Sequence, residues 1–122
     1  MIKRERWVEA CQSSELPERK HLTMDIQFAG EMISALLIRF QGAVYAYRNQ
    51  CVHMVRRLDS EGDHIFDSSG ELLRCTMHGI VYQPETGESL SNICHGQKLL
   101  SIKVTEDGGK IYFADKRVKR AE

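Results

Sequence analysis

The stretch MISALLIRFQGAVYAY, residues 32–47, contains two short apolar runs separated by Gln41-Gly42. Such runs on either side of a glycine-containing turn are typical of two antiparallel strands. Similar apolar or alternating runs recur along the chain. We expect strands over residues 6–11, 22–28, 32–40, 43–47, 72–74, 80–82, 99–104 and 110–113. The sequence therefore predicts an all-β fold, an antiparallel β sandwich or small barrel.

Glycine-containing turns separate these runs, because glycine readily adopts the positive φ that hairpin turns need. The turns are expected at Gly30, Gly42, Gly70, Gly87 and Gly108-Gly109. One helical turn is predicted at residues 13–18, with a serine as its N-cap and Pro17 ending it. A chain of 122 residues fits one modest core, so we expect a single domain over residues 1–122.

The overall charge of the chain indicates no charged partner. Lysine plus arginine and aspartate plus glutamate number 17 each, and the basic runs at residues 3–6 and 116–120 are expected to be solvated chain ends, not a nucleic-acid surface. No stretch reaches the roughly 18 apolar residues of a membrane span, and the first residues lack the apolar part of a secretory signal. We expect a cytoplasmic protein that does not bind membranes, whose cysteines serve metal or redox chemistry instead of disulfides.

Four potential metal ligands occur as two mixed pairs within 28 residues. Cys51 and His53 form a C-x-H pair, and Cys75 and His78 form a C-x-x-H pair. In each pair both side chains can leave one tight turn, so each turn can present one sulfur and one nitrogen. Two thiolates and two imidazoles are the ligands of a Rieske-type [2Fe-2S] cluster, in which cysteines hold one iron and histidines the other. The sequence therefore predicts a cluster site at these four residues, and no catalytic residue.

Two alternatives stay open on the residues alone. Two cysteines and two histidines could bind one zinc ion, although zinc sites usually pair like with like, as C-x2-4-C and H-x3-5-H. The four residues could also be unrelated buried thiols and surface imidazoles. Metal analysis and colour separate these cases, because a zinc protein is colourless.

Beyond its four candidate ligands, the chain resembles the Rieske iron-sulfur proteins, in particular the small Rieske-type ferredoxins. Residues 75–79, Cys-Thr-Met-His-Gly, resemble the second family motif, C-P-x-H-G, and residues 82–88 resemble the strand and turn that follow it. Residues 7–16 resemble the opening strand and loop of the family, and residues 99–113 its closing hairpin. The resemblance implies a Rieske-like antiparallel fold with a cluster-binding subdomain over about residues 49–96, formed by two loops.

The resemblance also implies a function as a one-electron carrier. Rieske-type ferredoxins of ring-hydroxylating dioxygenase systems pass electrons from a reductase to an oxygenase or another oxidoreductase. We therefore expect such redox partners, no enzymatic activity of the chain by itself, and a monomer. The alternative is a small electron-transfer subunit of a larger oxidoreductase complex, which stable co-purification with a large partner would indicate. A complete Rieske oxygenase is not expected, because 122 residues leave no room for its mononuclear iron domain.

The same resemblance assigns roles within the site. Cys51 and Cys75 are expected to hold the inner iron, and His53 and His78 the outer, reducible iron near solvent. Because the ligand histidines can lose their remaining N–H protons, the reduction potential is expected to fall at alkaline pH. Apolar neighbours that are expected to contact a redox partner are Met54, Val55, Met77 and Ile80.

Departures from the family pattern concern the surroundings of the cluster. Arg56 and Met77 stand where high-potential members carry a second pair of cysteines, so no bridge between the loops is expected. Ile80 replaces a serine that donates a hydrogen bond to the cluster, whereas Tyr82 matches a family tyrosine. We expect a potential toward the negative end of the roughly −150 to +300 mV range of Rieske centres.

The remaining cysteines and histidines are expected to bind no metal. Cys11 is expected to be a small buried apolar residue, and the resemblance places Cys94 near the cluster without binding iron. His21 and His64 are expected to be exposed. Residues 59–71 are polar and make the connection between the two motifs longer than is usual in the family, so we expect a solvent-exposed excursion there.

Overall fold

The computed structural model describes residues 7–50, 58, 65–66, 69–74, 81–90 and 97–119. In this part of the chain one short 3-10 helix, η2 (Ser13–Glu15), accompanies ten strands. The strands are β1 (Val8–Gln12), β2 (His21–Phe28), β3 (Glu31–Phe40), β4 (Ala43–Arg48), β5 (Leu73–Arg74), β6 (Val81–Tyr82), β7 (Ser101–Ile102), β8 (Val104–Asp107), β9 (Lys110–Phe113) and β10 (Val118–Lys119). All strand pairings in the described residues are antiparallel, which confirms the predicted fold class.

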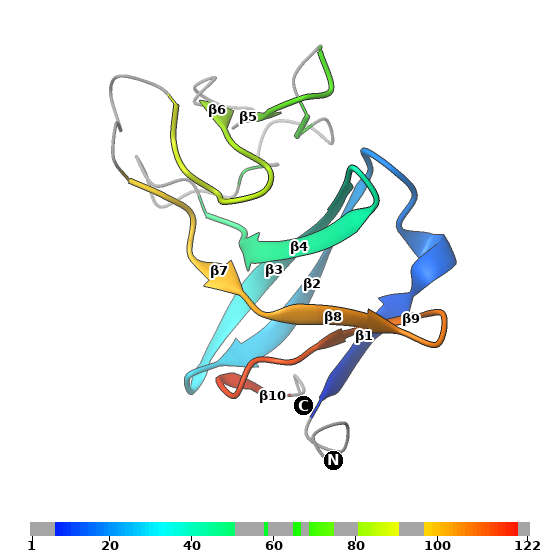
Figure 1. Ribbon diagram of the computed structural model, residues 1–122. Coiled ribbons are helices and arrows are strands. Elements are labelled where there is room, and N and C mark those ends of the chain that lie inside the picture. Colours follow the sequence, from blue (N-terminus) through cyan, green and yellow to red (C-terminus); the bar gives the residue numbers. More distant parts are fainter. Residues whose placement is uncertain are drawn as a thin grey trace.

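The strands form three sheets. Their orders are β1-β9-β8, β10-β2-β3-β4-β7 and the two-stranded β5-β6. Figure 1 shows that β5 and β6 lie at one end of the molecule and β10 lies at the other. The five-stranded sheet between these ends is the scaffold on which the remaining described elements pack.

Tight turns join the three longest strands. The turn between β2 and β3 has φ of 52° at Ala29 and 89° at Gly30, and the turn between β3 and β4 has φ of 51° at Gln41 and 84° at Gly42. Positive φ at two consecutive central residues is the geometry of type I′ hairpin turns, which suits the twist of paired strands. The two hairpins give β3 a partner along both edges, in agreement with the pattern of residues 32–47.

Both faces of β3 are covered, which explains its continuous apolar run. Alternate residues of a strand point to opposite faces of the sheet. Leu36 and Ile38 face one hydrophobic cluster, while Ala35 and Leu37 face another. A strand that is buried on both faces needs apolar residues at successive positions instead of alternate ones.

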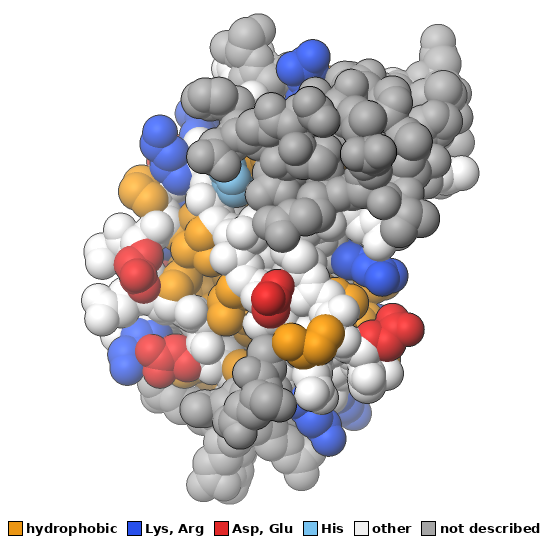
Figure 2. Space-filling model, turned by 180° about the vertical axis from the view of Figure 1, so that it is seen from behind, with side chains coloured by type: hydrophobic (Ala, Val, Ile, Leu, Met, Phe, Trp, Pro, Cys, Tyr) orange, Lys and Arg blue, Asp and Glu red, His pale blue; other side chains and the backbone are white. Residues whose placement is uncertain are grey.

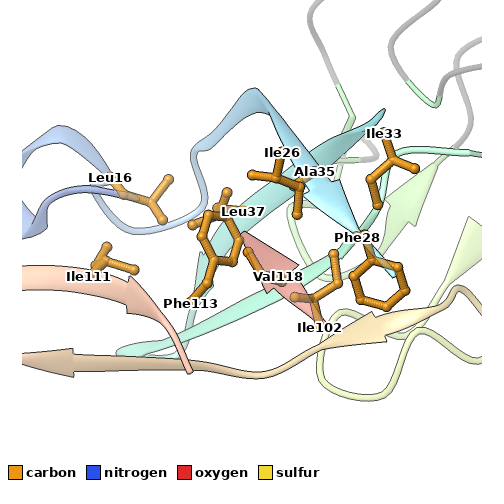
Figure 3. Packing of buried hydrophobic residues seen from close by; sticks show 11 residues of the cluster. Leu16, Ile26, Phe28, Ile33, Ala35, Leu37, Ile102, Ile111, Phe113 and Val118 are labelled. Carbon is orange, nitrogen blue, oxygen red and sulfur yellow. The ribbon is translucent and has the colours of Figure 1, made fainter. Parts of the chain in front are cut away.

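We name these two hydrophobic clusters after their position. The hairpin cluster consists of the buried residues Leu36, Ile38, Tyr47, Leu58, Ile65, Leu73, Tyr82 and Leu99. The sandwich cluster, shown in Figure 3, consists of Leu16, Ile26, Phe28, Ile33, Ala35, Leu37, Ala46, Ile102, Ile111, Phe113 and Val118. The sandwich cluster joins the five-stranded sheet to the three-stranded sheet, and the hairpin cluster joins it to β5 and β6.

The predicted strand at residues 99–104 is wrong as a single element. The chain leaves the five-stranded sheet after β7 and enters the three-stranded sheet at β8, with Lys103 between them. At this corner the Lys103 N–H donates to Asp115 Oδ2 (3.1 Å) and the Lys103 carbonyl accepts from Ala114 N–H (2.9 Å). These partners satisfy the backbone where the strand changes sheets, so the pairing with a single sheet is interrupted.

The C-terminal basic run is exposed at Lys116, Arg117 and Lys119, as expected, but Val118 within it is buried and the run is anchored to the fold. Asp115, itself only 6% exposed, accepts hydrogen bonds from Arg117 Nε (2.8 Å) and Nη2 (2.7 Å). The Arg117 guanidinium lies 4.5 Å from the centre of the Phe28 ring. Val118 is buried and its strand β10 pairs with β2. These contacts turn the run into an edge strand of the central sheet.

The helical turn occurs where it is predicted, but its N-cap is Gln12, not a serine. The Gln12 backbone N–H donates to Glu15 Oε1 at 2.8 Å. Nearby, Arg39 of β3 donates to Glu106 of β8 through both terminal nitrogens (3.0 and 2.7 Å) and to the Leu16 carbonyl through Nε (2.6 Å). The guanidinium lowers the pKa of the Glu106 carboxyl, chiefly through this hydrogen bonding. Arg39 therefore ties both sheets to the segment after η2.

The described surface carries both signs of charge. On the face seen in Figure 2, acidic and basic side chains are interspersed, without a large patch of one sign among the coloured residues. This distribution agrees with the neutral composition of the chain. Among the described residues no helix has the length and apolar character needed to cross a membrane.

Candidate metal centre

The four predicted ligands Cys51, His53, Cys75 and His78 lie outside the described residues, so their assignment stays a prediction. The structure instead describes the residues that flank them. Among the described residues, no three His, Cys, Asp or Glu side chains are grouped so that they could hold a metal ion. The described flanks show where each ligand pair is attached to the scaffold.

The flanks of the first pair are held together by Asn49, which directly follows β4. Its backbone N–H donates to the Ser34 carbonyl (2.8 Å) and its side-chain Nδ2 to Ser34 Oγ (3.2 Å). Its Oδ1 accepts a hydrogen bond from the Leu58 N–H at 2.9 Å. The first pair lies within residues 51–57. The residues on either side of this segment are thus held together by the bond between Asn49 and Leu58.

The flanks of the second pair are adjacent strands. Arg74 of β5 lies directly opposite Val81 of β6, and Leu73 lies opposite Tyr82. The Arg74 N–H also donates to the Ile65 carbonyl at 2.6 Å. Residues 75–80, which include the second pair, therefore begin and end at neighbouring positions of one hairpin.

One buried cluster lies beneath the flanks of both pairs. Leu58 follows the first pair, while Leu73 and Tyr82 stand on either side of the second, and all three belong to the hairpin cluster. Each of these side chains is at most 1% exposed. The fold thus brings the flanks of two pairs that are far apart in sequence onto one dry, packed base, as a shared metal centre requires.

The turn at residues 84–87 packs closely against the same cluster. The Tyr47 hydroxyl donates to the Pro84 carbonyl at 2.7 Å, and burial raises the pKa of this phenol above its usual range. Gly87 has φ of 77°, and a Cβ placed on it would lie 2.8 Å from Tyr47 Cε1 and 3.2 Å from Leu99 Cβ. Only glycine fits there without a shift of its neighbours. The alternation of Tyr45 and Tyr47 in the sequence does not reveal this contact.

A third segment begins and ends near the same base. Ser89 N–H donates to the Gln97 carbonyl at 2.8 Å, and Leu99 N–H donates to the Gly87 carbonyl at 2.8 Å. In sequence, residues 91–96 lie between the partners of each of these two bonds. Cys94, which the resemblance places near the cluster, lies outside the described residues.

The connection between the two pairs is not a wholly exposed excursion, so this expectation is wrong at Ile65. Ile65 is 1% exposed and belongs to the hairpin cluster. Phe66 is half-buried and stacks on Phe40 with ring centres 6.5 Å apart. Arg19 donates from Nε to the Gly70 carbonyl (2.8 Å) and from Nη2 to Glu71 Oε2 (2.9 Å). These contacts attach the connection to the central sheet.

The remaining predicted residues have mixed outcomes. Cys11 is half-buried against the sandwich cluster, and burial raises the pKa of its thiol, which agrees with a packing role. His21 is half-buried, not exposed as expected. His64 and the expected contact residues Met54, Val55, Met77 and Ile80 lie outside the described residues.

The donor set fits an iron-sulfur cluster chemically. Two thiols and two imidazoles match the ligands of a Rieske centre, and both pairs emerge from flanks that share one base. Asn49 is a residue of this region that the sequence analysis missed. Its only signal was the position of a short amide two residues before Cys51, at the end of a predicted strand.

The chain is similar to known proteins in its sequence pattern and in its fold. A family model described as "Rieske [2Fe-2S] domain" matches residues 6–108. No curated protein matches the chain.

Three similar solved structures illustrate the fold. The ferredoxin of carbazole 1,9a-dioxygenase from Nocardioides aromaticivorans IC177 is 23% identical, with a TM-score of 0.72 over 90% of this chain and 98% of that chain. A chain from the complex of reduced oxygenase and oxidised ferredoxin of carbazole 1,9a-dioxygenase is 23% identical, with a TM-score of 0.70 over 94% and 97%. A chain from a carbazole-bound oxygenase and ferredoxin complex is 22% identical, with a TM-score of 0.70 over 88% of this chain, which spans only 28% of that one.

Proposed function

Because the chain belongs to the Rieske [2Fe-2S] domain family, we propose that it is a one-electron carrier, a ferredoxin that passes electrons from a reductase to an oxygenase or another oxidoreductase. It would be the electron-transfer component of such a system and not an enzyme by itself. The proposal is supported by the shared fold with a ferredoxin that this chain covers over 98% of its length. We further propose that it acts as a cytoplasmic monomer, the ordinary state of a carrier that diffuses between a reductase and an acceptor.

In this function, each of the four proposed ligands has a distinct role. Cys51 and Cys75 would bind one iron, and His53 and His78 the other. The bound cluster supplies a site that accepts and returns one electron. Each imidazole keeps one ring N–H, so the two histidines can release protons as the charge of the site changes. The hairpin cluster beneath the flanks excludes water from that side of the site.

The observation that carries the proposal is the common base of the two ligand pairs. Leu58, Leu73 and Tyr82 are fully buried in one cluster although they flank pairs that lie far apart in sequence. Four unrelated thiols and imidazoles would not require this convergence. A zinc site could use the same base, so the metal must be identified by experiment.

The experiment is metal and sulfide analysis with electron paramagnetic resonance (EPR) of protein purified and reduced without oxygen. We expect stoichiometric iron and acid-labile sulfide, and a spectrum of a reduced centre with mixed cysteine and histidine ligands. The Cys75→Ser variant is expected to lose the cluster. The Cys11→Ser variant is the matched control, because Cys11 lies in β1 and packs against the sandwich cluster. Colourless protein with zinc, or cluster loss in the control variant, contradicts the proposal.

A second candidate is an electron-transfer subunit of a larger complex. It is favoured by the match to a longer chain in a complex of oxygenase and ferredoxin. A domain of this fold makes up 28% of that longer chain. Gel filtration of the protein drawn from its native cells distinguishes the two. A freely diffusing carrier elutes at the mass of the single chain, whereas a subunit elutes with a large partner.

A further inference from the structure

Asn49 is one of three polar or charged residues that are buried among the described residues. The residue is 4% exposed, and its side chain lies between Ser34 of β3 and Leu58, which follows the first ligand segment. The Nδ2 group donates to Ser34 Oγ of β3 (3.2 Å), and Oδ1 accepts from Leu58 N–H (2.9 Å). A buried polar group with partners on two elements holds those elements in register, because leaving either partner unsatisfied is costly.

The chemistry of the side chain suits this place. A carboxamide offers a donor on one side and an acceptor on the other, and the donor bond to Ser34 turns the acceptor toward Leu58. Alanine supplies neither group. The Asn49 backbone N–H donates to the Ser34 carbonyl (2.8 Å), so β3 holds both the main chain and the side chain of this residue.

The hydrogen bond to Leu58 joins the two residues on either side of the segment that includes the first ligand pair. Leu58 follows that segment directly, and its side chain is 1% exposed within the hairpin cluster. The Asn49 amide therefore bonds to the main chain on the far side of Cys51 and His53, across nine positions of sequence. The described residues on either side of positions 51–57 are thereby joined to β3, the central strand of the scaffold.

We propose that Asn49 is a positioning residue of the metal centre, which holds Cys51 and His53 in place by joining Ser34 on β3 to the main chain of Leu58. This inference rests on the proposed function of Cys51 and His53 as ligands. Asn49 binds no metal itself. Ligands on a segment with fixed ends stay near their binding geometry, whereas ligands on an open segment separate more readily from the metal.

The test compares cluster retention in three variants of the full chain. Asn49→Ala removes the side-chain bonds to Ser34 and Leu58, whereas Ser34→Ala removes only the bond to Nδ2. Asp115→Ala is the control, because Asp115 is also a buried side chain that accepts hydrogen bonds from two main-chain N–H groups, those of Lys103 and Arg117. In Figure 1 its neighbour β10 lies at the opposite end of the molecule from β5 and β6.

The first measurement is the rate at which the visible colour is lost in excess chelator. Removing residues that orient metal ligands typically costs ten- to a hundredfold in metal affinity, so we expect Asn49→Ala to lose its cluster roughly ten- to a hundredfold faster than the wild type. The rate of cluster loss in Ser34→Ala is expected to lie between the rates of Asn49→Ala and the wild type. Asp115→Ala is expected to melt at a lower temperature but to lose its cluster at nearly the wild-type rate when both are well folded.

The second measurement separates positioning from general stability. EPR spectra of the reduced variants should show shifted g-values for Asn49→Ala and unchanged ones for Asp115→Ala. Hydrogen exchange of the Leu58 amide should accelerate in Asn49→Ala, while exchange of the Ser89 amide, bonded to Gln97, should not.

The inference is overturned if Asn49→Ala and Ser34→Ala keep the wild-type spectrum and the cluster-loss rate of Asp115→Ala. If Asn49→Ala does not fold, the same readouts on Ser34→Ala decide the question. A wild-type protein without iron and sulfide would instead contradict the proposed function, and the Leu58 exchange result would still report whether Asn49 closes the segment.

Discussion

Gly87→Ala is expected to destabilise the protein through contact with Tyr47. Gly87 has φ of 77°, and the new Cβ would lie 2.8 Å from Tyr47 Cε1. The Tyr47 ring cannot easily move away, because it is 2% exposed and its hydroxyl is bonded to the Pro84 carbonyl. Either the turn or the buried ring must shift.

The size of the effect follows from two contributions. An L-residue in the left-handed region costs roughly 1–2 kcal/mol. Forcing an extra carbon into packed surroundings costs roughly 1–3 kcal/mol more. Gly30→Ala is the matched control, because Gly30 has φ of 89° and a Cβ placed there meets no atom within 4 Å. The control should therefore show the first contribution alone.

The assay is thermal unfolding of the three proteins under identical oxygen-free conditions. One kcal/mol changes the melting temperature of a domain of this size by roughly 3–6 °C, so Gly87→Ala should melt several degrees below Gly30→Ala. In a Tyr47→Leu background the ring carbon is absent, and the cost of Gly87→Ala should fall toward that of Gly30→Ala. Equal melting temperatures for the two single variants would refute the steric reasoning.

Three further predictions concern charge and redox behaviour. The bonds from Arg117 and two main-chain N–H groups hold the pKa of Asp115 well below its ordinary value, so its stabilisation is complete above about pH 4 and is lost as pH falls below that value. The melting temperature of Asp115→Asn should therefore fall less than that of the wild type between pH 4 and pH 2, and a parallel fall contradicts the assignment. Arg19→Gln removes the ion pair with Glu71. Because the two side chains are 40% and 55% exposed, the free energy of unfolding should change by at most about 1 kcal/mol. Hydrogen exchange at residues 69–74 should nevertheless accelerate, and unchanged exchange would show that Arg19 does not hold this segment. The reduction potential should fall at alkaline pH because His53 and His78 lose protons more readily when the cluster is oxidised, and protein-film voltammetry that shows a potential independent of pH contradicts histidine ligation.

The hairpins could be predicted from the sequence because their causes are local. At Gly30 and Gly42 a residue with easy access to positive φ stands between two apolar runs, and the strands on both sides form within a residue or two of the predicted bounds. The spacing of the two ligand pairs is equally local. It identifies a donor set, and the structure adds that the flanks of both pairs share one buried base.

The wrong predictions concern residues whose structure depends on partners that are distant in sequence. The interruption of the predicted strand at Lys103 follows from Asp115, twelve positions away, which bonds to the Lys103 N–H. The edge strand β10 forms in a basic run because the Arg117 side chain pairs with Asp115 and covers Phe28. Ile65 stands in a polar segment, and only the position of β5 places it in the hairpin cluster. Composition and periodicity contain none of this information.

The two buried side chains that hold strand ends differ in charge, and the difference matches their surroundings. Asp115 is a carboxylate whose charge is balanced by the guanidinium of Arg117. Both residues precede β10, which lies at the opposite end of the molecule from β5 and β6 in Figure 1. Asn49 performs the same kind of main-chain bonding with a neutral amide, two residues before Cys51. A carboxylate beside cysteine thiolates would repel their negative charge and favour the oxidised state of a nearby cluster, which lowers its potential. A neutral amide makes the same main-chain bond without adding a negative charge near the cysteines, so asparagine can hold Leu58 without lowering the potential further.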